Sequence, residues 1–86
     1  MAGIIKKTAG EALRDARVKA NVTYRKVAEK SGMNNYQYVQ KVMNPKYNAR
    51  THIFVLIANA LGYDIIMRDR VTDEEIIIIS SGGDDE

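Results

Sequence analysis

Apolar residues recur every three or four positions through most of the first 62 residues, which is the spacing of one face of a helix. The pattern predicts four helices, over residues 4–20, 24–30, about 35–43 and 52–61. Gly10 weakens the first helix by roughly 1 kcal/mol relative to alanine, so its regular part could begin only at Glu11. The predicted fold of this region is therefore mainly α.

Capping residues mark the ends of these predicted helices. Thr23 is placed to accept a hydrogen bond from a free backbone N–H in the first turn of the second helix. Asn34 or Asn35 can do the same for the third helix, and Thr51 for the fourth. Gly62 follows the fourth helix, where glycine tolerates the positive φ that ends many helices.

The pattern changes after Gly62. Residues 63–70 and 75–80 are rich in β-branched residues and flank the turn segment 71–74, so they predict an antiparallel β-hairpin. Consecutive isoleucines place apolar groups on both faces of the second strand, and a lone hairpin is only marginally stable in water. We therefore expect one face to pack on the helices and the other on a second copy of the chain. The predicted dimer-interface residues are Ile65, Met67, Ile76, Ile77, Ile78 and Ile79. The alternative is a hairpin that packs on its own helices and leaves an apolar edge exposed.

Short groups of residues between positions 22 and 62 have the spacing of a helix-turn-helix. They are Val22-Thr23, Val27-Ala28, Ser31-Gly32-Met33 and the run from Ala58 to Gly62. Ala28 is small where two helices must cross closely, and Gly32 tolerates the positive φ of a sharp turn. In a helix-turn-helix the second helix is shaped to enter a DNA major groove.

On these residues the chain resembles the Cro/CI-type (XRE-like) family of small phage and bacterial transcriptional regulators, over about residues 10–62. Further matches, to core positions and one basic position of that family's first and fourth helices, are Leu13, Ala16, Arg17, Phe54 and Ile57. The resemblance implies a four-helix, lambda-repressor-like helix-turn-helix domain, with the hairpin standing where related proteins have a fifth helix.

Two departures from the family pattern concern the third helix. Lys41 falls where the family places a core residue, so we infer one extra residue in the preceding turn. The residues expected to face inward are then Tyr36, Val39, Val42 and Met43. The family often has an acidic residue late in this helix that pairs with the basic residue of the first helix. That acid is missing here, so Arg17 has no predicted partner.

With this register, the outward side of the third helix carries amides, a tyrosine and a lysine but no acid. Asn and Gln can form paired hydrogen bonds with adenine, and Lys can reach guanine or phosphate. The predicted base-reading residues are Asn34, Asn35, Gln37, Tyr38, Gln40 and Lys41. Phosphate contacts are predicted on either side, from Thr23, Tyr24, Arg25, Lys46, Tyr47, Asn48, Arg50 and Thr51. The alternative is a polar surface that contacts nothing.

The charge distribution favours the nucleic-acid interpretation. The net charge is only +2, but residues 1–52 carry +8 and residues 53–86 carry −6. Residues 30–63 contain no Asp or Glu. A basic half that coincides with the helix-turn-helix pattern is typical of a protein that turns one face to phosphate.

Length and composition indicate one small unit in three parts: a helix-turn-helix domain over residues 1–62, a dimerising hairpin over residues 63–80 and a disordered acidic tail over residues 81–86. No apolar run is long enough to cross a membrane, so we expect a soluble, cytoplasmic protein. The chain has no cysteine, which excludes disulfides, thiolate nucleophiles and cysteine-based zinc sites.

An enzyme is not expected. His52 is the only histidine, and the chain has no nucleophile–base pair, glycine-rich phosphate loop or metal-ligand spacing. No cofactor is predicted, and the predicted partners are double-stranded DNA and a second copy of the chain. The leading hypothesis is a homodimeric repressor that binds an inverted-repeat operator. Two alternatives stay open: an antitoxin that binds a toxin and regulates its own promoter, and a phage-encoded inhibitor that binds a host protein.

Overall fold

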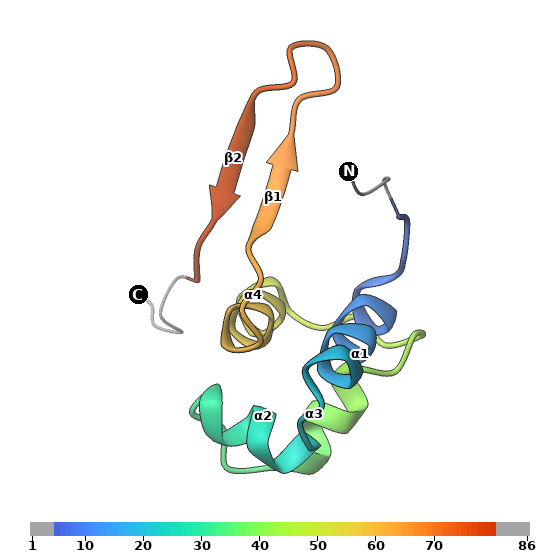
Figure 1. Cartoon of the computed structure of the whole chain (residues 1–86), viewed down its shortest axis with the longest axis vertical. Helices are drawn as coiled ribbons and strands as arrows, with labels where there is room; N and C mark the ends of the chain where they lie inside the picture. Colours follow the sequence, from blue (N-terminus) through green and yellow to red (C-terminus); the bar gives the residue numbers. More distant parts are fainter. Residues whose placement is uncertain (1–4, 81–86) are drawn as a thin grey trace.

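Four helices and a two-stranded hairpin make up the chain in the computed structural model, which describes residues 5–80 (Figure 1). The elements are α1 (Ala9–Ala20), α2 (Tyr24–Lys30), α3 (Tyr36–Val42), α4 (Thr51–Ala60), β1 (Ile65–Arg68) and β2 (Glu75–Ile78). The mainly helical composition, the number of helices and the C-terminal hairpin were all predicted from the sequence. The expectations for the acidic tail and for residues 1–4 lie outside the described residues.

Helix α1 begins later than the apolar pattern predicted. Thr8 is its N-cap, because the Thr8 hydroxyl accepts a hydrogen bond from the backbone N–H of Glu11. The Glu11 carboxylate in turn accepts one from the backbone N–H of Thr8, which completes a capping box. Ile5, which the predicted helix over residues 4–20 included, therefore lies outside the helix and is 75% exposed.

Gly10 lies inside α1 for a packing reason. Glycine is a poor helix former, yet a Cβ at this position would overlap the carbonyl of Asn44, in the loop that follows α3. The absence of a side chain lets α1 approach that loop closely. The sequence had suggested only that Gly10 weakens the helix.

The boundaries of α2 and α3 follow their capping residues, as predicted. The Thr23 hydroxyl accepts a hydrogen bond from the Lys26 N–H at 3.1 Å, and the Asn35 side chain accepts one from the Gln37 N–H at 2.9 Å. Gly32 has a φ of 72° in the turn between the two helices. The structure thus selects Asn35 over Asn34 as the cap of α3.

The start of α4 differs from the prediction. Thr51 is its first helical residue, and Arg50 occupies the N-cap position without a side-chain hydrogen bond. Thr51 is therefore not the capping residue. The C-terminal end is as predicted, because Gly62 follows the C-cap with a φ of 90° and donates its N–H to the Asn59 carbonyl.

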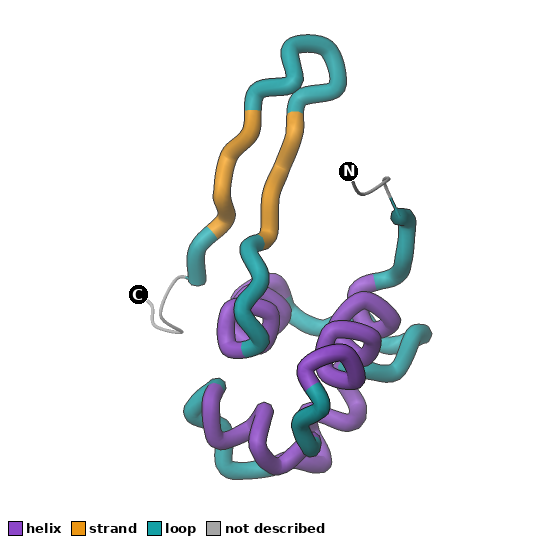
Figure 2. The backbone as a smooth tube through the Cα atoms, in the orientation of Figure 1, coloured by secondary structure: helices purple, strands orange, loops and turns teal. Residues whose placement is uncertain are grey.

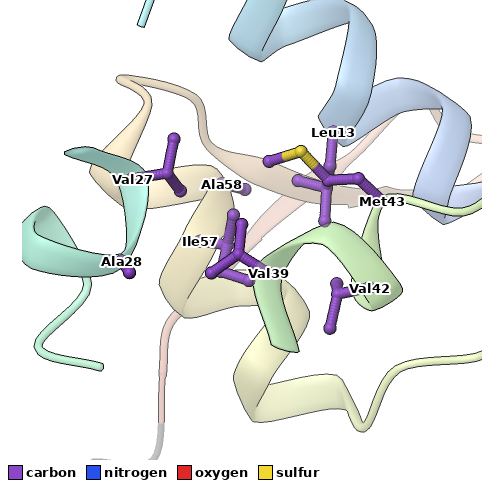
Figure 3. Packing of buried hydrophobic residues seen from close by; sticks show 8 residues of the cluster. All are labelled: Leu13, Val27, Ala28, Val39, Val42, Met43, Ile57 and Ala58. Atoms are coloured by element: carbon purple, nitrogen blue, oxygen red, sulfur yellow. The ribbon is translucent and has the colours of Figure 1, made fainter. Parts of the chain in front are cut away.

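The core lies where the four helices meet (Figure 3). Its buried cluster consists of Leu13, Val27, Ala28, Val39, Val42, Met43, Ile57 and Ala58. Three of the four residues predicted to face inward, Val39, Val42 and Met43, are at most 1% exposed. Tyr36 packs against the cluster and is partly buried. The inferred register of α3 is therefore confirmed.

The hairpin projects from the end of α4, away from α2 and α3 (Figures 1 and 2). Its antiparallel register pairs Ile65 with Ile78, Ile66 with Ile77, Met67 with Ile76 and Arg68 with Glu75. Ile65, at the base of the hairpin, is the strand residue that packs against the core cluster within the described part of the chain. The prediction that a whole face would cover the helices was wrong, because β1 leaves the helical surface after its first residue.

None of the helices within residues 5–80 combines the length and the apolar character needed to cross a lipid bilayer.

Candidate nucleic-acid interface

The exposed side of α3 is formed by residues that lie one helical turn apart. Gln37, Gln40 and Lys41 are all exposed, whereas Val39 and Val42 on the opposite side are buried. Asn44, in the loop just after the helix, is also exposed and lines a hollow together with Lys41. The face is polar and carries one positive charge and no negative charge. Asn44 was not among the predicted site residues.

Tyr38 is less exposed than predicted. It is partly buried and packs against the core together with Tyr47, from the loop between α3 and α4. Burial and a hydrogen bond with Tyr47 raise the pKa of Tyr38 above its ordinary value of 10.0. This contact ties α3 to the loop that follows it. Tyr38 therefore helps to hold α3 in position, whereas it was expected to form part of the exposed face of α3.

A shallow hollow connects the end of α3 with the following loop. It is lined by Lys41, Asn44, Lys46 and Tyr47. The Lys41 ammonium lies 5.4 Å from the centre of the Tyr47 ring, within the range of a cation–π contact. The Asn44 side-chain oxygen accepts a hydrogen bond from the backbone N–H of Lys46 at 2.9 Å. The structure thus brings together a predicted base-reading lysine and a predicted phosphate-binding lysine.

The N-terminus of α2 holds three of the predicted phosphate contacts. Thr23 and Arg25 are exposed, but Tyr24 is partly buried against the core. The Arg17 guanidinium lies 4.2 Å from the centre of the Tyr24 ring and donates a hydrogen bond to the Val22 carbonyl at 2.8 Å. Arg17 therefore has partners that the sequence did not predict: an aromatic ring and a backbone oxygen take the place of an acid.

A second hollow lies between α2 and the turn before α3. It is lined by Arg25, Ala28, Glu29, Met33, Asn34 and Tyr36. The Arg25 guanidinium stacks 4.8 Å from the centre of the Tyr36 ring, which positions this charge beside the start of α3. Asn34 and Asn35 are both exposed here. The Asn35 side-chain oxygen is already used as the cap of α3, so Asn34 is the freer of the two amides.

The loop from Asn44 to Arg50 presents the remaining predicted contacts. Lys46, Asn48, Arg50 and Thr51 are exposed, while Tyr47 and Ala49 between them pack against the core. Alternate residues of the loop thus serve two purposes: the inner ones fix the backbone and the outer ones extend to solvent. The loop lies beside the C-terminal end of α3.

The charge around this surface is one-sided. Glu29 is the one acidic residue that lines either hollow, and its carboxylate lies 3.7 Å from the Lys26 ammonium. Since residues 30–63 contain no acid, α3 and the following loop contribute only positive charge. Such a surface attracts a polyanion and does not repel it locally.

The described residues offer no metal centre: between positions 5 and 80, no three His, Cys, Asp or Glu side chains lie close enough to hold an ion. His52 is partly buried near the start of α4.

Comparisons with protein-family models, with curated proteins and with solved structures find no match to this chain.

The predicted dimer-interface residues lie on both faces of the hairpin. Met67, Ile76 and Ile77 are 52–57% exposed, and Ile79, just beyond β2, is 79% exposed. Ile66, which was not predicted to lie in the interface, is 48% exposed. Ile65 and Ile78 at the base are partly buried. The described part of the chain therefore leaves most of the hairpin's apolar surface uncovered.

Proposed function

We propose that this protein is a sequence-specific DNA-binding regulator whose third helix, α3, reads bases in the major groove. The observation that carries the proposal is the exposed face of α3 formed by Gln37, Gln40 and Lys41, with Asn44 beside Lys41 in the following loop. Amide and lysine side chains at helical spacing can bond base edges, and the absence of a carboxylate avoids repulsion by phosphate.

The arrangement around α3 supports a helix-turn-helix of the lambda-repressor type. Helix α2 packs directly on α3, and the two are joined by a turn that contains Gly32 in a left-handed conformation. Arg25 at the start of α2 and Lys46 after the end of α3 flank the proposed reading face. Contacts to phosphate from both sides would fix the position of α3 in the groove.

The regulator acts as a homodimer on an inverted repeat. The hairpin carries the uncovered apolar residues and projects away from α2 and α3, so a second copy can bind it without covering α3 (Figure 1). Two α3 helices would then enter major grooves about 34 Å apart, or a multiple of that spacing. Repression follows when the bound dimer occludes RNA polymerase.

Selection of bound duplexes from a random DNA pool, at about 0.15 M salt, tests the proposal directly. We expect enrichment of a palindromic sequence. Retention of DNA without enrichment of any sequence would contradict sequence-specific reading and leave only a basic surface.

Two matched variants test the residue roles. Gln37→Ala combined with Gln40→Ala should reduce the preference for the selected sequence by about 1–3 kcal/mol per lost bidentate contact, and leave weak, salt-sensitive binding. Lys46→Ala should weaken binding to all sequences about equally and reduce the salt dependence by roughly one counterion. Unchanged specificity in the glutamine variant would show that other residues read the bases.

The exposed apolar surface of the hairpin also supports a second candidate function, that of an antitoxin that binds a toxin. The hairpin has apolar residues on both faces, including Ile66 and Ile77 on the face opposite Met67, so a dimer that uses one face leaves the other free. Co-expression with the product of the adjacent gene, followed by purification of a complex of fixed stoichiometry, would distinguish an antitoxin from a simple repressor.

A further inference from the structure

The two faces of the hairpin differ in composition. The register places Ile65, Met67, Ile76 and Ile78 on one face, which we call the Met67 face, and all four are apolar. The opposite face carries Ile66 and Ile77 together with the charged pair Arg68 and Glu75. A second copy that packs on the Met67 face would therefore bury no charged residue of the strands, so this face is the better dimer interface.

The Met67 face alone is too small for a stable dimer. It offers four side chains per copy, whereas a specific interface uses roughly 20–30 residues on each side. A stable dimer that begins at this face must extend onto further surface. The surface that continues from Ile65 is the one to consider.

An apolar groove lies at the base of the Met67 face. Two adjoining hollows share Ala12, Ala16 and Tyr63, and the more enclosed one is also lined by Phe54 and Ile65. The more enclosed hollow has a volume of about 240 Å³. A cavity of roughly 150 Å³ accommodates a benzene ring, so a branched apolar side chain fits in this one.

Two-fold symmetry determines what reaches this groove. When two hairpins pack through their Met67 faces in opposite directions, with the two-fold axis beside Met67, the tip of each hairpin lies beside the base of the other. Tyr63 lines both hollows, and Val71 lies in the loop at the hairpin tip with 90% of its surface exposed.

We infer that the protein forms a reciprocal dimer in which the hairpin tip of each copy inserts Val71 into the groove between α1 and the base of β1 of the other copy. This inference deepens the homodimer of the proposed function, on which it rests, and assigns a groove that the hairpin residues alone do not include.

The charges of the tip and the groove favour docking beside α1. The loop between the strands carries three acids and one arginine: Asp69, Arg70, Asp73 and Glu74. The hollow beside α1 is lined by Lys7, Lys19 and Asp15, whereas the other hollow is lined by Asp64. An acidic tip is therefore attracted to the α1 side of the groove, where lysines outnumber acids.

The tip has a fixed shape before it binds. The Asp69 carboxylate accepts hydrogen bonds from the backbone N–H groups of Val71 and Thr72, at 2.8 and 3.2 Å. The Asp69 N–H donates to the Glu74 carbonyl at 2.8 Å and closes the loop. An ordered tip loses less conformational entropy on docking than a flexible one.

Engineered disulfides test the geometry, because the chain has no cysteine of its own. Chains with Ala12→Cys and chains with Val71→Cys are mixed, oxidised and separated by mass without reductant. We expect a covalent heterodimer in at least about tenfold higher yield than either variant alone gives, since a disulfide requires Cα atoms within about 7 Å. Val71→Cys mixed with Glu29→Cys, an exposed position on α2, is the matched control and should remain monomeric.

A second pair of variants tests which face lies on the two-fold axis. Met67→Cys should cross-link to itself, and its neighbour Ile66→Cys, on the opposite face, should not. Cross-linking through Ile66 would overturn the inference. So would a covalent dimer through Met67 without any Ala12–Val71 link, although the hairpin dimer of the proposed function would then stand. A chain that sediments as a monomer at micromolar concentration would contradict both, whereas DNA selection tests base reading separately.

Discussion

The helical part and the hairpin of this protein use apolar residues in opposite ways. In the helices, Val27, Val39 and Ile57 are completely buried, and the polar residues between them face solvent. In the hairpin, Met67 and Ile77 are each 57% exposed. The helices therefore bury their own apolar residues, whereas the described part of the chain leaves most apolar residues of the hairpin exposed. An apolar sequence pattern predicts that residues are buried, but it does not say whether the same chain or another molecule covers them.

The largest expected effect on the free energy of unfolding is that of replacing an isoleucine in the helical core, compared with replacing one in the hairpin. Ile57→Ala should lower the free energy of unfolding by about 2–5 kcal/mol, because it leaves a cavity in the core. Ile66→Ala, on the hairpin face that carries charges, should change it by less than about 0.5 kcal/mol. Urea denaturation followed by circular dichroism measures both. Equal losses would mean that the hairpin is as well packed as the core.

Gly10→Ala should also destabilise the helical part, although alanine is the better helix former. The added Cβ would overlap the Asn44 carbonyl, and relief of such overpacking costs about 1–3 kcal/mol. The same measurement checks this. Stabilisation by about 1 kcal/mol, the value for an unobstructed helix position, would show that α1 does not approach the loop so closely.

Met67→Lys should affect the hairpin without affecting the helices. A charge at the centre of the Met67 face should weaken dimerisation by at least about tenfold, since it would be buried without a partner. Sedimentation over a range of protein concentrations measures the dimer affinity. The helical circular dichroism signal should stay unchanged, and Ile66→Lys is the matched control on the other face.

The smallest effect concerns Tyr38 and alkaline pH. Because its pKa is raised in the folded chain, Tyr38 contributes stability that is present below pH 10.0 and is lost as the pH rises through the raised value. The free energy of unfolding should therefore fall more steeply above that pH for the wild type than for Tyr38→Phe. Parallel curves would show that the Tyr38 hydroxyl titrates as it does in an unfolded chain.

Much of the site could be predicted, but not the orientation of each residue. The spacing of Val39 and Val42 was enough to determine the register of α3 and hence the exposure of Gln37 and Gln40. Tyr38 was misplaced because a tyrosine next to a polar residue can face either way. Its direction is decided by Tyr47, which packs beside it from the following loop. The partner of Arg17 was missed for the same reason, since aromatic rings bind guanidinium groups without any charge signal in the sequence.

The sequence by itself determined the local features: the four helices, the cap at Thr23, the glycine turns and the hairpin. These depend on neighbours within a few residues, where periodicity and side-chain chemistry act directly. Only the tertiary structure decided that Gly10 makes room for the Asn44 carbonyl, that α1 begins after Thr8, and that the hairpin leaves the helices after Ile65. Those features depend on how segments far apart in the sequence pack against one another. The same apolar pattern is compatible with several packing arrangements.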